Sequence, residues 1–408
     1  MTTSAPARPS GPVGVVAQHP SVRTLAMIAL ALGGFGIGTT EFVAMGLLPE
    51  MASSLGITEP IAGHVISAYA LGVVVGAPLI AALTARVPRK TLLIALMAAF
   101  TIGNAATVFA PNYGVLMVAR FVAGLPHGAY FGVAALVAAH LADRGRRARA
   151  VALVMMGLSV ANVVGVPVAS WLGQSLGWRS AFALVAVIGV VTLGAIWSWV
   201  PALAAMRMTN PLTELGALRR PQVWMTLIIG MVGFGGMFAV YTYISTTLTD
   251  VAGLSRSLVP LALMIYGLGM VAGNLIGGKL ADRALIPGLF ASMTALGVLL
   301  GIFVTASHNP YTALLLVFFV GAAGASMVPG LQTRLMDVAA DAQTLAASLN
   351  HAALNIANAF GAWIGGVVIT AGYGYTAPAA VGALLAVAGL VVLTVAVAME
   401  RRSARSSR

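Results

Sequence analysis

Apolar runs of about 20 residues recur along the whole chain, separated by short clusters that contain charged residues, proline, glycine or asparagine. A helix needs about 20 predominantly apolar residues to cross a lipid bilayer. Only 8% of the 408 residues are charged, whereas a soluble domain carries roughly 25%. The chain is therefore expected to be an all-α protein that crosses a membrane many times.

Breaking the apolar runs at these clusters predicts twelve transmembrane helices. The chain contains 47 glycines, and small residues allow helices to pack closely in lipid. The predicted spans are 23–48, 61–84, 91–109, 114–141, 150–173, 179–201, 222–247, 258–281, 287–306, 311–336, 345–371 and 377–399.

The basic residues fall on one side of these predicted helices. With both termini in the cytoplasm, 19 of the 22 Lys and Arg residues lie in cytoplasmic segments, and only Arg179 and Arg256 lie in outer loops. Cytoplasmic loops of membrane proteins carry this excess of positive charge. Orientation in a bacterial cytoplasmic membrane thus explains the net charge of +12, and nucleic acid is not an expected partner.

Polar segments divide the chain into two bundles. Residues 1–22 are rich in Ser, Pro and Gly and lack the regions of a secretory signal, which predicts a disordered cytoplasmic tail. A cytoplasmic linker at 202–221 separates six-helix bundles at 23–201 and 222–399, and a basic cytoplasmic tail follows at 400–408.

The two bundles share a sequence repeat. With a shift of 197 residues, segment 69–76 (YALGVVVG) overlies segment 266–273 (YGLGMVAG). Parallel halves of six helices each are typical of secondary transporters, whose substrate site lies near the middle of the membrane between the halves. Such a chain forms its own cavity, so we expect it to act as a monomer in the lipid bilayer.

The pattern of helices and loops resembles the major facilitator superfamily over essentially the whole chain after residue 20. The family's loop motif, Gly-x-x-x-Asp-Arg-x-Gly-Arg-Lys, is similar to residues 81–90 (AALTARVPRK), in which Ala85 replaces the aspartate. The second-half copy, residues 278–283 (GKLADR), keeps this acid as Asp282. In the family this acid helps to latch the halves together on the cytoplasmic side, and the start of the fifth helix is the expected partner here. The resemblance implies a conformational latch of Arg86, Arg89, Lys90, Asp282 and Arg283.

Other motifs resemble the branch of this family that holds arabinose-efflux permeases and chloramphenicol-resistance exporters. They are TEF at 40–42, PHG at 126–128, ANV at 161–163 and GWR at 177–179. The fifth predicted helix also carries an altered drug-antiporter motif, GLSVANVVGVP at 157–167, in which proline and small residues permit a kink and close packing. The resemblance implies proton-coupled export, by alternating access, of small amphipathic compounds such as chloramphenicol or a sugar-like metabolite.

Glu41 is expected to be the only acid buried in a helix, and Arg120 the only arginine. At 1.5 Å per residue from the nearest outer helix end, Glu41 lies roughly 10 Å and Arg120 roughly 9 Å deep. Charges in hydrocarbon are costly and usually pair inside the bundle. Neither residue has a charged counterpart in the second half, which favours a proton site over the alternative, a structural clamp.

This predicted proton site depends on the distance between Glu41 and Arg120. A nearby guanidinium favours loss of the Glu41 proton, and separation of the two groups or a competing polar substrate favours its return. Arg120 itself stays protonated. His127, two turns further along the same helix face, is a second proton-coupling candidate, with a packing histidine as the alternative.

Tyrosines and uncharged amides at membrane depth are candidates for the substrate cavity, because aromatic rings and a few polar groups suit an amphipathic ligand. Hydrogen bonding between helices is the alternative role for the amides. The candidate cavity residues are Tyr69, Asn162, Tyr241, Tyr243, Tyr266, Asn274, Asn355 and Asn358.

Several other classes of function lack their signatures in this sequence. It contains no Gly-x-x-x-x-Gly-Lys-Ser/Thr phosphate loop, so we expect a proton gradient, and no cofactor, to supply the energy. With no cysteine and no paired histidine spacing, no metal site is expected. The sequence contains no protease motif that would favour an intramembrane enzyme. It also contains no soluble sensory domain that would favour a receptor. A proton-coupled uptake symporter is the nearest alternative.

Overall fold

The structure is a computed structural model that describes residues 20–84, 86–142, 147–202, 216–339 and 343–406. These residues are almost entirely helical, and none of them forms a strand. Most of the predicted tail at 1–22 and of the predicted linker at 202–221 lies outside the described residues.

The described residues of the first half form eight α-helices. A π-helical turn at Ala161–Gly165 joins α6 to α7, so that together they make the predicted fifth crossing. The helices are α1 (Pro20–Gly46), α2 (Leu48–Leu55), α3 (Glu59–Leu83), α4 (Arg89–Val108), α5 (Tyr113–Leu141), α6 (Arg147–Val160), α7 (Val166–Leu176) and α8 (Trp178–Trp199).

In the second half, α12 contains two of the predicted helices, which meet at a kink where Ala284 has non-helical φ and ψ of −159° and 81°. The last helix continues past its predicted end at residue 399, so the described part of the predicted basic tail is helical. The helices are α10 (Pro221–Thr242), α11 (Ile244–Thr246), α12 (Val259–Ala306), α13 (Pro310–Ala339), α14 (Gln343–Val368) and α15 (Ala377–Ser406).

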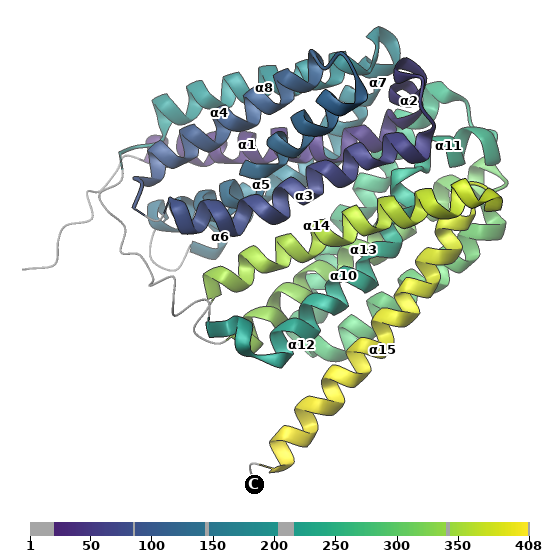
Figure 1. Cartoon of the computed structure of the whole chain (residues 1–408). Coiled ribbons are helices and arrows are strands. Elements are labelled where there is room, and N and C mark those ends of the chain that lie inside the picture. Colours follow the sequence, from purple (N-terminus) through teal and green to yellow (C-terminus); the bar gives the residue numbers. More distant parts are fainter. Residues whose placement is uncertain (1–19, 85, 143–146, 203–215, 340–342, 407–408) are drawn as a thin grey trace, which may run out of the picture.

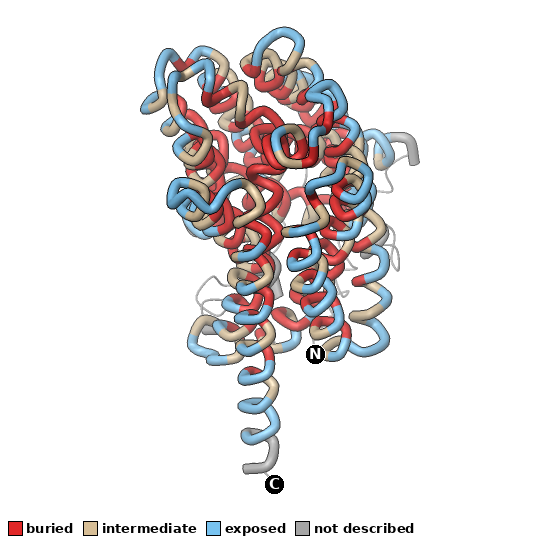
Figure 2. The backbone as a smooth tube through the Cα atoms, turned by 90° about the vertical axis from the view of Figure 1, so that its right-hand side faces the viewer, coloured by how far each residue is buried: buried red, intermediate tan, exposed pale blue. Residues whose placement is uncertain are grey.

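The described helices have the length and surface of membrane-crossing segments. Eleven segments are long and apolar enough to cross a membrane, and one of them, Arg256–Ala306, has 51 residues and includes the kink at Ala284. That segment therefore accounts for two of the twelve predicted crossings. Large apolar side chains such as Leu83 and Phe109 are exposed. Buried residues gather in the interior of the bundle (Figure 2). The chain is a multi-pass membrane protein.

The two halves lie side by side, with α3 packed along α14 and α7 packed on α12 (Figure 1). Following the predicted orientation, we call the end with the α1–α2 and α14–α15 connections the outer end. The opposite end, with the loop after α3, is the inner end. The last turns of α15 extend beyond the neighbouring helices (Figure 1).

The sequence repeat corresponds to equivalent helix contacts in the two halves. A Cβ atom on Gly124 of α5 would lie 2.1 Å from the Tyr69 carbonyl oxygen in α3, and one on Gly321 of α13 would lie 2.7 Å from the Tyr266 carbonyl oxygen in α12. Both pairs of residues are related by the shift of 197. Glycine is required because a side chain would prevent this close approach of the helix backbones.

Polar contacts between the halves are found at the outer end. Thr246 Oγ1 donates a hydrogen bond to Glu59 Oε2 at 2.5 Å, and Arg256 Nε lies 3.1 Å from Glu50 Oε1. A cavity of about 580 Å³ beside them is lined from both halves, including Glu59 and Tyr375. The outer ends of the two halves are therefore held together by charged and polar groups.

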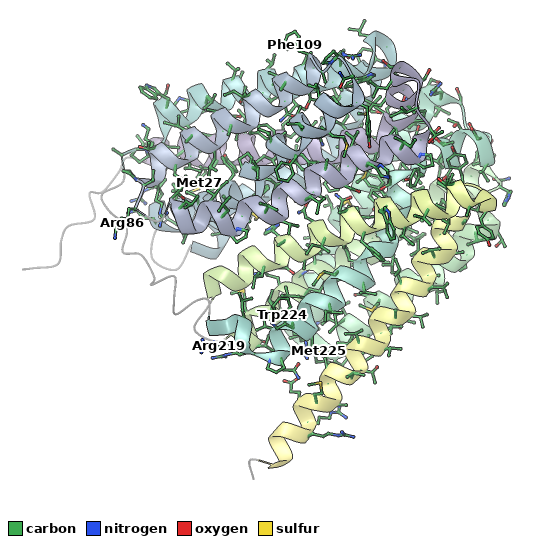
Figure 3. All side chains as sticks on the ribbon, in the orientation of Figure 1. Met27, Arg86, Phe109, Arg219, Trp224 and Met225 are labelled. Atoms are coloured by element: carbon green, nitrogen blue, oxygen red, sulfur yellow. The ribbon has the colours of Figure 1, made fainter. Side chains whose placement is uncertain are left out.

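The predicted latch residues lie at the inner end, where Figure 3 labels Arg86. Asp282 forms no ion pair with any described residue, and the side chains of residues 143–149, which include its predicted partner, lie outside the described part of the chain. Lys90 Nζ donates to the Trp197 carbonyl oxygen at 2.7 Å. None of the five residues is buried: Arg86, Arg89, Lys90, Asp282 and Arg283.

Candidate functional site

Arg120 of α5 is completely buried and bound to α1. Its Nη1 donates to Thr40 Oγ1 at 2.9 Å, and its Nη2 donates to the Thr40 carbonyl oxygen at 3.0 Å. The two parallel donors of a guanidinium suit this paired arrangement of acceptors. Arg120 therefore joins α5 to α1 through a neutral residue.

Aromatic rings and a buried amide complete the surroundings of Arg120. The guanidinium carbon lies 4.4 Å from the centroid of the Tyr69 ring and 5.0 Å from that of Phe182, distances that allow cation–π attraction. Thr40 Oγ1 in turn donates to Asn104 Oδ1 at 2.5 Å. Side chains from α1, α3, α4, α5 and α8 thus converge on one positive charge.

Glu41 is buried, with 7% of its surface exposed, but it is not ion-paired with Arg120. It has no hydrogen bond to any described residue, although it lies within electrostatic range of Arg120, Tyr69 and Tyr241. Its carboxylate oxygens are not among the fully buried polar atoms that lack partners. Glu41 and Arg120, which were predicted to be neighbours, are therefore close in space. The small exposed part of Glu41 includes its carboxylate.

A second arginine is buried, so the prediction that Arg120 is the only one is wrong. Arg334 of α13 is 3% exposed, and its Nη2 lies 3.3 Å from Glu400 Oε2 and donates to Gln222 Oε1 at 3.3 Å. The physical reason is that α13 continues to Ala339, past its predicted end at residue 336, so Arg334 lies within the bundle and contacts α10 and α15. Arg334 lies five residues before the end of α13, near the inner end of the bundle.

His127 connects the Arg120 cluster to the second half. Its Nδ1 is hydrogen-bonded to the Tyr69 hydroxyl at 3.0 Å, and its ring centroid lies 5.3 Å from that of Phe131. Phe131 stacks on His351 of α14, with centroids 5.8 Å apart and planes 3° apart. No sequence pattern singles out His351, because only helix packing brings it opposite α5.

The cavity candidates of the second half include a stacked tyrosine pair and unpaired amides. The ring centroids of Tyr241 and Tyr266 are 4.0 Å apart, and the two rings are nearly parallel. The ring centroid of Phe42 in α1 lies 5.8 Å from that of Tyr241. Asn358 is buried with both Oδ1 and Nδ2 unpaired among the described residues, as are Asn355 Oδ1 and the Tyr266 hydroxyl. Phe42 follows Glu41 directly, so these residues lie beside the first-half cluster.

Tyr243 and Asn274 lie apart from this arrangement, whereas Asn162 packs against it. The Tyr243 hydroxyl donates to the Ala362 carbonyl oxygen at 2.9 Å and packs near the outer end. Asn162 lies in the π-helical turn, and its Nδ2 donates to its own helix while its Oδ1 is buried without a partner among the described residues. A Cβ atom on Gly267, next to Tyr266, would lie 2.3 Å from the Asn162 carbonyl oxygen. Asn274 is half-buried two turns after Tyr266. Within the described chain, no cluster of three or more metal-ligating side chains occurs.

Comparisons with known proteins agree with this fold. A family model described as Major Facilitator Superfamily matches residues 30–298 and 247–408. Inner membrane transport protein YdhP of Escherichia coli (strain K12) is 42% identical over 369 residues, which cover 90% of this chain and 94% of that protein. The Chloramphenicol resistance protein of Streptomyces lividans is 36% identical over 379 residues, covering 90% of this chain and 95% of that protein.

Among solved structures, a bacterial homologue of the human lysosomal transporter Spinster, in an inward-facing and unoccupied conformation, has a TM-score of 0.69. It shares 16% sequence identity with this chain, and the match covers 93% of this chain and 96% of that one. At this level of identity the similarity is one of fold.

Proposed function

Because the chain belongs to the major facilitator superfamily, we propose that it exports small amphipathic compounds across the bacterial cytoplasmic membrane in exchange for protons. Both termini lie in the cytoplasm, and a single chain is sufficient for transport. The observation that carries the proposal is a buried, unpaired Glu41 close to the anchored Arg120. The name of the Streptomyces lividans relative supports export as the direction.

Glu41 is the proton site. A carboxyl group without an ion pair or a hydrogen bond can exchange its proton without first breaking such a contact. The positive charge of Arg120 favours the ionised form, and a lipid-facing bundle disfavours an unpaired charge. Glu41 would therefore take up a proton when open to the outside and release it when open to the cytoplasm, where substrate enters.

The contacts between the halves support an alternating-access cycle. Polar contacts hold the outer ends together, while the five latch residues at the inner end are not buried. In the opposite conformation, Asp282 would meet the start of the fifth crossing and close the inner end. Inward flow of protons would supply the energy for this exchange.

Accumulation of labelled chloramphenicol in energised inverted vesicles tests this function. Native protein should accumulate the compound when the vesicle interior is acidic. Glu41→Gln should not, since an amide side chain, unlike a carboxyl group, does not bind and release a proton in this pH range. Asp250→Asn is the matched control because it neutralises an exposed acid outside the site. Equal accumulation by native protein and Glu41→Gln would remove Glu41 from coupling, and accumulation only in right-side-out vesicles would replace export with uptake.

A further inference from the structure

A groove at the inner end of the second half combines two arginines with an apolar wall. It has a volume of about 380 Å³ and lies between α15 and the second span of α12. Its lining residues are Phe290 of α12 and Thr394, Val397, Ala398, Arg401 and Arg402 of α15. None of them belongs to the site around Arg120, so the proposed transport function assigns no role to this groove.

Small side chains on α15 leave the groove open opposite Phe290. Thr394 and Ala398 are four residues apart, as are Ala398 and Arg402, so these three side chains share one face of the helix. The Thr394 hydroxyl donates back to the Leu390 carbonyl oxygen of its own helix. The part of the groove nearer the middle of the membrane is therefore apolar, and the charged groups lie towards its inner end.

The two arginines have no anionic partner among the described residues. Glu400 is the only acid of α15, and Arg334 of α13 lies 3.3 Å from it. Residues 287–306 of α12, which form the opposite wall, contain no charged residue. Arg401 and Arg402 are exposed and form no ion pair or hydrogen bond with any described residue. The groove therefore favours an anion supplied from outside the chain.

The charges lie at the depth of the lipid headgroups. Arg401 is 24 residues after Ala377, with which α15 begins at the outer end, and is therefore roughly 36 Å along the helix. The hydrocarbon core of a bilayer is about 30 Å thick, and the thickness with the headgroups is about 40–45 Å. Arg401 and Arg402 are thus beyond the hydrocarbon, in the headgroup region of the inner leaflet.

Exposed apolar side chains continue from the groove towards the middle of the membrane. They are Val391 and Val387 on α15 and Val298 on α12. A ligand in the groove would have its anionic end at the two arginines and an apolar part along these valines. An anionic phospholipid has both parts, whereas a free phosphate ion has no apolar part.

We propose that this groove binds an anionic phospholipid of the inner leaflet, with the lipid phosphate held by Arg401 and Arg402. A guanidinium matches a phosphate group through two parallel hydrogen bonds. Basic pockets between membrane helices on the cytoplasmic side are suited to such headgroups. The acyl chains lie along the exposed valines, and the lipid joins α15 to the second span of α12.

The affinity of the purified full-length protein for dioleoyl-phosphatidylglycerol, measured by native mass spectrometry, tests this site. Dioleoyl-phosphatidylcholine has no net charge, and inorganic phosphate has no acyl chain. Native protein should bind phosphatidylglycerol about thirtyfold more tightly than phosphatidylcholine, and inorganic phosphate should not displace it. Arg401→Gln and Arg402→Gln should each weaken this binding about fivefold, as expected for about 1 kcal/mol per arginine near a membrane surface.

Two control variants separate the groove from general surface charge. Arg219→Gln removes an exposed arginine of the inner end that does not line the groove (Figure 3), and it should keep the native affinity. Ala398→Leu fills the groove but retains both arginines, and it should bind the lipid about tenfold more weakly. Ala388→Leu, at an exposed alanine earlier on α15, should bind it as the native protein does.

All of these substituted side chains are exposed, so each variant should unfold at the native temperature when no lipid is added. Native affinity in Arg401→Gln and Arg402→Gln, or an equal loss in Arg219→Gln, would overturn the site. Native affinity in Ala398→Leu would overturn the role of the groove. Equal binding of phosphatidylcholine, or displacement by inorganic phosphate, would overturn the anionic phospholipid as its ligand. None of these measurements depends on transport, so failure of the proposed function would leave the lipid site in place.

Discussion

The Arg120 guanidinium is anchored on Thr40, through both the side-chain hydroxyl and the backbone carbonyl. Thr40 precedes Glu41 on α1, so the positive charge is fixed to the helix that carries the acid. We therefore expect the distance between Glu41 and Arg120 to change through side-chain rearrangement within the first half, with little separation of α1 from α5.

Thr40→Val should destabilise the protein by about 2 kcal/mol or more, because it leaves Arg120 Nη1 and Asn104 Oδ1 without their partner. Thr39→Val is the adjacent control, since the Thr39 hydroxyl bonds only to the Phe35 carbonyl oxygen in its own helix. Thermal unfolding of the two variants should give the larger decrease for Thr40→Val. Equal decreases would mean that the Arg120–Thr40–Asn104 network adds no stability.

Arg120→Lys should abolish most gradient-driven chloramphenicol accumulation although the charge is kept. An ammonium cannot make two parallel hydrogen bonds to Thr40 and cover the Tyr69 ring at the same time. Arg334→Lys provides the control, because Arg334 reaches its partners through Nη2 alone at 3.3 Å. Full activity of Arg120→Lys would show that a positive charge at this position supports transport without the paired hydrogen bonds to Thr40.

Thr246→Val should loosen the outer end by removing the hydrogen bond to Glu59. The chain has no cysteine, so a single Asn355→Cys reporter can be labelled with an impermeant maleimide added outside. Its labelling rate should rise about fivefold, as expected when about 1 kcal/mol of contact free energy is lost.

The control for this outer contact is Thr249→Val, since the Thr249 hydroxyl bonds only within the second half, to the Thr246 carbonyl oxygen and Asp250. It should leave the labelling rate unchanged. The same rate in Thr246→Val and the native background would assign no closing role to the Thr246–Glu59 contact.

Gly273→Ala should destabilise the second half by about 1–3 kcal/mol, because its Cβ atom would lie 2.1 Å from the Ala322 carbonyl oxygen of α13. Gly278→Ala in the same helix should be neutral or stabilising by up to about 1 kcal/mol, since nothing lies within 4 Å of its Cβ position. Thermal unfolding of both variants checks the difference. A stable Gly273→Ala would mean that α12 and α13 can move apart without cost.

The membrane-crossing helices could be predicted from the sequence because lipid requires long apolar segments. The repeat was also correctly located, since Gly124 and Gly321 make equivalent contacts in the two halves. The extension of α15 was missed: its last residues are polar and basic, and a polar segment carries no apolar signal for a helix. The burial of Arg334 was missed as well, because α13 also continues past its predicted end.

The sequence by itself determined the membrane fold and singled out Glu41 and Arg120, because a charge inside an apolar helix is rare enough to be seen without a structure. Tertiary structure alone decided that Arg120 binds Thr40 and that the Asn358 amide is unpaired. It also decided that His127 and His351 both pack against the Phe131 ring. These contacts depend on how each helix is rotated about its axis. In helices that are apolar on nearly every face, the sequence pattern does not encode that rotation.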